Sequence, residues 1–260
     1  MQGSRLSGWT TRNRTTQGSG KSTLASTIAE LGKTLFIDLN GEKGTRSFQG
    51  ASYAKNIDVI RPSSVTQFDD LFWTLDKGDH PYNAVVVDSL TALQKMTMRY
   101  LLGHDETAVR EIKQGTAPAD MRTWGQSLDV MQDTATFWYG LADGERSHPM
   151  HVVMTAQTKL SENELTGETS RQPDVQKGAA PDYVVYCDLE DNLDALSDDT
   201  LPPTKHILRF GSSTAYRTKA RVPVNLRGKI PPVLGRGKSS PDLARLTKLL
   251  QIGGSTPAAK

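Results

Sequence analysis

The feature that most constrains the fold is the run Gly18-Ser19-Gly20-Lys21-Ser22-Thr23, which stands immediately before a helix-forming stretch. Glycines let the backbone approach an anion closely, and the free amides at the start of a helix attract phosphate oxygens. A lysine in such a run neutralises phosphate charge, and the hydroxyl after it can bind Mg²⁺. The run is therefore typical of a phosphate-binding loop between a strand and a helix of an α/β fold, and it predicts ATP with Mg²⁺ as the ligand.

The loop supplies the first candidate site. We expect nucleotide contacts from seven consecutive residues: Gln17, Gly18, Ser19, Gly20, Lys21, Ser22 and Thr23. Lys21 would pair with the β- and γ-phosphates, and the Ser22 hydroxyl would bind Mg²⁺. The full G-x-x-x-x-G-K-[ST] pattern has glycine where this chain has Thr15. Because a β-branched residue fits unusual backbone angles poorly, we expect an atypical entry to the loop.

A second element is the apolar strand 82–89, whose sequence YNAVVVDS ends in the carboxylate of Asp88. An aspartate at the carboxyl end of a buried strand, next to a phosphate loop, can orient the water molecules on Mg²⁺. This is the form of a Walker B strand. Its position after GSGKST predicts that Ser22 and Asp88 lie at the same metal site.

Short apolar runs alternate with helix-like stretches along the chain, which indicates buried strands joined by crossover helices in a mostly parallel sheet. We predict strands at 34–39, 57–60, 84–88, 151–156 and 183–188, and helices at 21–31, 65–75, 90–102, 121–141 and 241–250. Runs 207–210 and 214–219 flank Gly211-Ser212-Ser213 and predict an antiparallel hairpin. Segments 104–119 and 158–180 read as long loops. The segment before the phosphate loop has few apolar residues, so we expect a missing or atypical first strand.

The chain divides into three predicted parts: an atypical N-terminal segment at 1–14, an ATPase core at 15–222, and a C-terminal extension at 223–260 with a short helix and a disordered tail. Its charged and hydrophobic fractions, 23% and 36%, are those of an ordinary folded protein. No apolar run approaches the roughly 20 residues that span a bilayer, and the N-terminus lacks the apolar stretch of a signal peptide. We therefore expect a cytoplasmic protein with no membrane partner.

Charge is segregated within the C-terminal part of the chain. Residues 182–199 include seven acidic residues and no Lys or Arg, whereas residues 205–238 include nine basic residues and no Asp or Glu. Blocks of this kind can be solvated surfaces. A purely basic stretch also suits a polyanion or an oppositely charged subunit contact.

Four segments together, GSGKST, TLFIDLNGE, VVVDSLTAL and HVVMTAQT, resemble the core of the RecA superfamily. They are most similar to the phage RecA-like recombination ATPases that work with single-strand annealing, which are AAA-domain nucleotide-binding proteins. The resemblance covers roughly residues 15–222. It implies a RecA-like P-loop core with a mostly parallel sheet flanked by helices and a C-terminal antiparallel hairpin extension.

The resemblance also implies a catalytic base after the second strand. In that family a glutamate just after this strand activates the attacking water. Strict spacing places Asn40 at that position, so Glu42 is the preferred base and Asp38 the second candidate. Glu42 can also be a solvated turn residue.

Further roles follow from the same resemblance. Gln157, after the fourth strand, would sense the γ-phosphate and pass its state to the loop 158–180, which would contact DNA. Lys219 and Arg221 resemble the basic pair that RecA-like subunits insert into a neighbour's nucleotide site. A buried structural glutamine and a solvent-facing strand are the competing interpretations of these residues.

The function implied is hydrolysis of Mg-ATP on single-stranded DNA during phage recombination or annealing, in the host cytoplasm if the chain is phage-encoded. Self-assembly into a ring or filament is expected, with a single-strand-annealing or single-strand-binding protein as a further partner. Two other functions stay open. One is a small-molecule or nucleoside kinase with the same loop, and the other is a non-catalytic nucleotide-binding scaffold in which Thr15 and the displaced Glu42 mark lost activity.

Overall fold

The structure of the 260-residue chain is a computed structural model. It describes residues 6–10, 20–39, 44–103, 119–162, 169–173, 183–198, 200–210, 219–220, 222, 226, 230, 232–235 and 241–254. Side chains are described at these positions except 6–10, 158–162, 169–173, 219–220 and 251–254.

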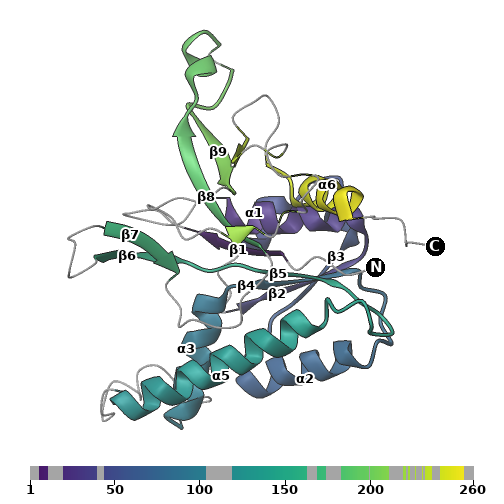
Figure 1. The fold of residues 1–260 in the computed structure, drawn as a ribbon, viewed down its shortest axis with the longest axis vertical. Helices are drawn as coiled ribbons and strands as arrows, with labels where there is room; N and C mark the ends of the chain where they lie inside the picture. The colour runs from purple at the N-terminus through teal and green to yellow at the C-terminus, as the bar shows by residue number, and fades with distance from the viewer. Residues whose placement is uncertain are drawn as a thin grey trace.

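Four parallel strands form the centre of the fold, in the order β3-β2-β4-β5 (Figure 1). Their bounds are β2 Thr34–Asp38, β3 Ile57–Ile60, β4 Ala84–Asp88 and β5 His151–Met154. Every residue of β2 and β4 is buried, as expected for central strands covered on both faces. The α/β class and the mostly parallel sheet predicted from the sequence are confirmed.

Helices cover both faces of this sheet. The bounds are α1 Lys21–Ser26, continued by the 3₁₀ helix η1 Thr27–Leu31, then α2 Val65–Asp76, α3 Leu90–Leu101, α5 Met121–Gly140 and α6 Leu243–Gly254. Helices α2, α3 and α5 lie on one side of the sheet, and α1 and α6 lie on the other (Figure 1). Side chains alternate along a strand, so Ile37 packs with the first group and Phe36 with the second.

Three helices begin at capping residues that the sequence supplies. The side chains of Ser64, Ser89 and Asp120 accept hydrogen bonds from the backbone N–H three residues later, at the starts of α2, α3 and α5. Such caps satisfy amides that have no partner within the helix. Because Ser89 follows Asp88 directly, the cap also fixes where β4 ends and α3 begins.

A second sheet contains β1 Leu6–Thr10, β8 Tyr183–Asp191, β9 Thr204–Arg209, β10 Lys219–Ala220 and β11 Val233–Leu234. Strand β1 pairs in parallel with β8 and also lies beside β5, so it connects the two sheets. The first strand, expected to be missing or atypical, is thus a five-residue strand. This segment has few apolar residues, but all five of its residues pair in regular register with β8. Backbone pairing with β8 therefore holds it as a strand.

The antiparallel extension predicted from the sequence is confirmed, but its strands pair differently. Strand β9 pairs with β8 and β11, while Lys219 and Ala220 of β10 pair with the start of β8 and not with β9. Residues 211–218 lie outside the described part of the chain. Strand β8 is long enough to pair with both strands along one edge. Strand β10 pairs with Tyr183 and Val184, and β9 pairs with β8 from Tyr186 onward.

Two predicted loops had different outcomes. The segment predicted as a loop at 158–180 contains an antiparallel pair, β6 Thr158–Glu162 with β7 Thr169–Pro173, so that prediction was wrong for these ten residues. The other predicted loop lies almost entirely outside the described residues.

The predicted C-terminal helix is confirmed as α6 and packs into the core around Leu24. None of the helices in the described part of the chain could cross a membrane.

Candidate functional site

The centre of the candidate site is a direct contact between α1 and β4. The Ser22 hydroxyl donates a hydrogen bond of 2.6 Å to Oδ2 of Asp88. The other oxygen, Oδ1, accepts a hydrogen bond from the Thr155 hydroxyl, just beyond β5. Asp88 is only 2% exposed, so the two hydroxyls fix the direction of a buried carboxylate. The structure therefore brings together Ser22 and Asp88, the two residues expected to share a metal.

Gly44 lies against this pair. It begins the 3₁₀ helix η3 Gly44–Phe48. A Cβ atom added to it would lie 2.6 Å from Oγ of Ser22 and 2.9 Å from Oδ2 of Asp88, closer than non-bonded atoms tolerate. A side chain at this position would therefore have to displace Ser22, Asp88 or η3. No local sequence pattern marks Gly44, because its contact depends on how η3 folds back onto α1.

Asp38 is the register partner of Asp88 at the carboxyl end of the neighbouring strand β2. Arg61 donates from Nε to its Oδ2 at 2.9 Å, and a second nitrogen of Arg61 donates to the Thr45 hydroxyl at 3.0 Å. Oδ1 of Asp38 is buried and has no hydrogen-bond partner among the described residues. Burial raises the pKa of Asp38; Arg61 opposes that rise, and the charge of Asp88 adds to it. An oxygen of this kind is ready to accept a hydrogen bond from a ligand or water.

The exit of β5 is fixed to the start of α3. The Leu90 amide donates to the Thr155 carbonyl at 2.8 Å, and the Gln157 amide donates to the Thr91 hydroxyl at 3.0 Å. Gln157 is partly buried and is followed immediately by β6. Gln157 thus links the first turn of α3 to the start of β6.

The described end of the phosphate loop meets the second sheet. Gly20 has φ 79° and ψ 12°, a left-handed conformation that favours glycine, and it is the N-cap of α1. Burial raises the pKa of Cys187 in β8 to about 12, and the positive charge of Lys21 acts against that rise. Lys21 is thus close enough to β8 for its charge to be felt there.

Several predicted site residues lie outside the described part of the chain: Gln17, Gly18, Ser19, Glu42 and Arg221. Lys219 is described only as backbone, in β10. Thr23 belongs to the first turn of α1, where its carbonyl accepts a hydrogen bond from Ser26. Their predicted roles remain predictions.

The oxygens present suit Mg²⁺. The described residues contain no group of three or more His, Cys, Asp or Glu side chains arranged to hold a metal ion. Mg²⁺ is commonly bound by one or two protein oxygens together with water and substrate phosphates. The Ser22 hydroxyl, the Asp88 carboxylate and the unpartnered oxygen of Asp38 are hard donors of the kind that this ion takes.

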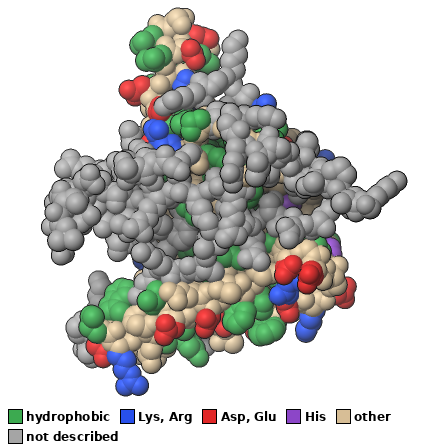
Figure 2. All heavy atoms as spheres, in the orientation of Figure 1, with side chains coloured by type: hydrophobic (Ala, Val, Ile, Leu, Met, Phe, Trp, Pro, Cys, Tyr) green, Lys and Arg blue, Asp and Glu red, His purple; other side chains and the backbone are tan. Residues whose placement is uncertain are grey.

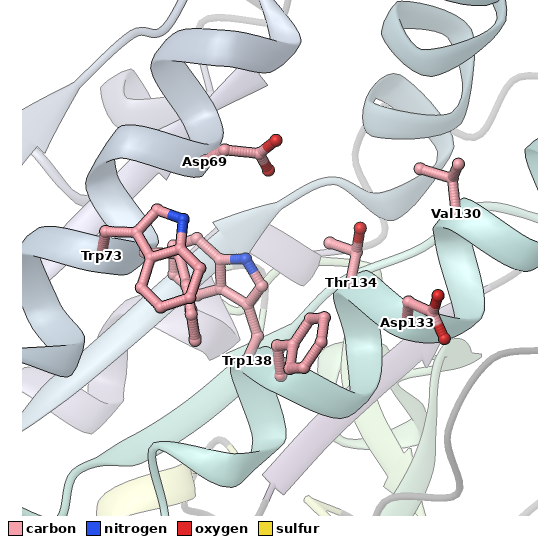
Figure 3. Close-up of a pocket in the computed structure, with 8 residues that line it drawn as sticks. Asp69, Trp73, Val130, Asp133, Thr134 and Trp138 are labelled. Atoms are coloured by element: carbon pink, nitrogen blue, oxygen red, sulfur yellow. The ribbon is translucent and has the colours of Figure 1, made fainter.

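A separate pocket of about 240 Å³ lies between α2 and α5 (Figure 3). It is lined by Asp69, Phe72, Trp73, Val130, Asp133, Thr134, Phe137 and Trp138. Apolar and acidic side chains are mixed along this helix pair, at the lower edge of Figure 2. The pocket shares no residue with the contact between Ser22 and Asp88.

Part of the chain matches a known protein family. The family described as "AAA domain" matches residues 15–222, well over half of the chain. None of the curated proteins matches. Among solved structures, the chain is similar to that described as "Crystal structure of the RadB recombinase", at 14% identity and a TM-score of 0.40, with 80% of each chain covered.

Proposed function

The chain belongs to the AAA domain family, and from this premise we propose that it binds and hydrolyses Mg-ATP at the site built around Ser22 and Asp88. The observation that carries the proposal is the 2.6 Å hydrogen bond between their side chains. It joins the hydroxyl after the loop lysine to the carboxylate that ends β4, the two groups that metal-nucleotide binding requires at one place.

Each residue has a defined part in this proposal. Ser22 and Asp88 would hold Mg²⁺, which when bound neutralises negative charge on the phosphate oxygens. Thr155 holds the Asp88 carboxylate in position. Lys21 pairs with the β- and γ-phosphates, and the loop residues Gln17 to Gly20 supply backbone amides.

Two carboxylates compete for the role of base. Asp38 has a buried oxygen with no partner among the described residues and a raised pKa, and both properties favour accepting a proton from water. Glu42 is the residue predicted from the sequence resemblance. Substitution separates the two: loss of turnover with retained ATP binding in Asp38→Asn but not in Glu42→Gln would assign the base to Asp38, and the reverse would assign it to Glu42.

We further propose that hydrolysis is coupled to single-stranded DNA in an assembly of several copies. The support is the sequence resemblance and the position of Gln157, which is bonded to α3 and precedes β6 directly. Lys219 and Arg221 would reach the nucleotide of a neighbouring copy. A single-strand-annealing or single-strand-binding protein would be the partner in recombination.

The experiment is ATP hydrolysis measured across protein concentration, with and without single-stranded DNA, for the wild type and Lys21→Ala. We expect Mg²⁺-dependent turnover that rises with DNA and with concentration, and a loss of about 100-fold or more in Lys21→Ala. Lys77→Ala, an exposed lysine at the C-cap of α2, is the matched control. Wild-type turnover that Lys21→Ala leaves unchanged would remove the proposal. Phosphoryl transfer to small acceptors in place of water would assign a kinase.

A further inference from the structure

The imidazole of His206 lies against the phosphate loop. His206 belongs to β9, in the second sheet, whereas Gly20 is the N-cap of α1. A Cβ atom added to Gly20 would lie 2.8 Å from Nδ1 of His206 and 3.1 Å from its Cε1. The ring therefore occupies the space directly beside the loop glycine.

The pattern of β9 explains how His206 reaches this position. Side chains alternate along a strand, so His206 shares a face with Leu208. Leu208 is fully buried and packs with Leu24 of α1 in the core on that side of the sheet. His206 is one step further along the same face, where the core ends, and its side chain is exposed. The core contact thus fixes β9 beside α1, and the imidazole extends from it to the beginning of that helix.

A second observation places the same sheet at the loop. Cys187 of β8 is the register partner of Leu208, and the positive charge of Lys21 acts against the rise that burial causes in the pKa of Cys187. The residues on either side of the helix start, Gly20 and Lys21, are therefore both close to the β8–β9 pair.

Two cations of β9 form ion pairs with three acidic residues of β8 and η5. Arg209 donates to Asp188 at 3.2 Å and to Glu190 at 3.1 Å, and Lys205 lies 3.8 Å from Asp194. These ion pairs offset negative charge that would otherwise oppose an anion beside β9.

We propose that His206 is a further nucleotide-binding residue, supplied by the antiparallel sheet, whose imidazole N–H donates a hydrogen bond to a β- or γ-phosphate oxygen beside Gly20. The proposal rests on the ATP-binding function proposed above. An imidazole always carries at least one ring N–H donor, and a bond to a charged phosphate is stronger than one between neutral groups. Nucleotide occupancy would then connect β9 to the phosphate loop.

The test is isothermal titration of ATP, ADP and AMP into the wild type, His206→Ala, His206→Gln and Thr204→Ala. Thr204 is exposed on the same face of β9 and is the matched control. We expect His206→Ala to weaken ATP and ADP binding about tenfold, the effect of losing one hydrogen bond to a charged group, and to leave AMP binding unchanged. His206→Gln keeps an N–H donor, so it should retain most of the ATP affinity, and Thr204→Ala should match the wild type.

Wild-type ATP affinity in His206→Ala, a tighter complex, or an equal loss for AMP would overturn the proposal. If His206→Ala does not fold, the His206 ring resonance of the wild type decides: it should shift on adding ATP, and an unshifted resonance overturns the proposal as well. Lys21→Ala, titrated in parallel, separates the two claims. If Lys21→Ala loses ATP binding and His206→Ala does not, the role of His206 is rejected. If the wild type itself does not bind ATP, the proposed ATP function is rejected.

Discussion

Asp38 and Asp88 are direct register partners at the carboxyl ends of β2 and β4, and the protein stabilises these two buried carboxylates in different ways. Asp88 accepts hydrogen bonds from the hydroxyls of Ser22 and Thr155. Asp38 accepts from Arg61 with one oxygen and leaves the other without a partner among the described residues. The carboxylate of Asp88 is therefore held in a fixed orientation, whereas Asp38 keeps one oxygen that can accept a further hydrogen bond.

The burial of the Asp38 carboxylate gives a prediction for how the free energy of unfolding depends on pH. Its pKa is raised in the folded protein, chiefly by burial, so the folded state binds more protons than the unfolded state just above pH 3.8. The contribution of Asp38 to the free energy of unfolding therefore falls as pH rises from 3.8 to the raised pKa that Asp38 has in the folded protein.

Asp38→Asn removes this contribution. Urea unfolding of the wild type and the variant, compared between about pH 4 and pH 7, should show a stability difference in favour of the variant that grows as pH rises through that interval. Asp129→Asn, at an exposed aspartate in α5, is the control and should leave the pH dependence unchanged. If the stability difference between the wild type and Asp38→Asn does not change with pH, the raised pKa of Asp38 in the folded protein is contradicted.

Much of the site followed from short-range sequence pattern, because its principal residues stand at the ends of strongly patterned elements. Ser22 lies in the first turn of a helix that follows glycines, and Asp88 ends a run of buried apolar residues, so the local sequence predicts both positions. Gly44 and His206 were missed because their contacts join distant segments, and no local pattern carries that information.

The fold shows the same division. Buried parallel strands such as β2 and β4 were found from their apolar runs. The pairing of the later strands was not, because β10 is only two residues long and β6 and β7 lie in a polar stretch. Each of these strands pairs with whichever neighbouring strand has a free edge. The sequence of the strand itself does not specify that neighbour.

Gly44→Ala should damage the site without unfolding the protein. The added methyl group would lie 2.6 Å from Oγ of Ser22, so the Ser22–Asp88 contact must open or η3 must move. We expect ATP turnover to fall about tenfold or more, since small misplacements of positioning groups have large effects on rate. Turnover equal to that of the wild type would show that the close approach of η3 is not needed.

Gly125→Ala is the matched glycine substitution and carries its own prediction. Gly125 is inside α5, and a Cβ atom there would meet nothing within 4 Å. Alanine should stabilise the protein by about 0.5 to 1 kcal/mol, because glycine loses more conformational freedom in a helix. Urea unfolding measures the gain, and turnover should stay at the wild-type level. A destabilised variant would mean that α5 contacts something at this position.

If Lys219 and Arg221 act on the nucleotide of a neighbouring copy, their loss should affect DNA-stimulated hydrolysis but not ATP binding. Lys219→Ala or Arg221→Ala should reduce DNA-stimulated ATP hydrolysis while leaving ATP affinity of the dilute protein unchanged, since a cation from a neighbour acts only in the assembly. Comparing turnover at high protein concentration with affinity at low concentration makes the distinction. Equal losses in both measurements would place these residues in their own subunit's site or in its folding.

The most direct test of the central claim is calorimetric titration of ATP with Mg²⁺ and with EDTA into the wild type, Ser22→Ala and Asp88→Asn. If the Ser22–Asp88 pair is the metal-nucleotide site, Mg²⁺ will tighten ATP binding by the wild type, and both substitutions will remove that gain. An equal Mg²⁺ effect in all three proteins would contradict the account.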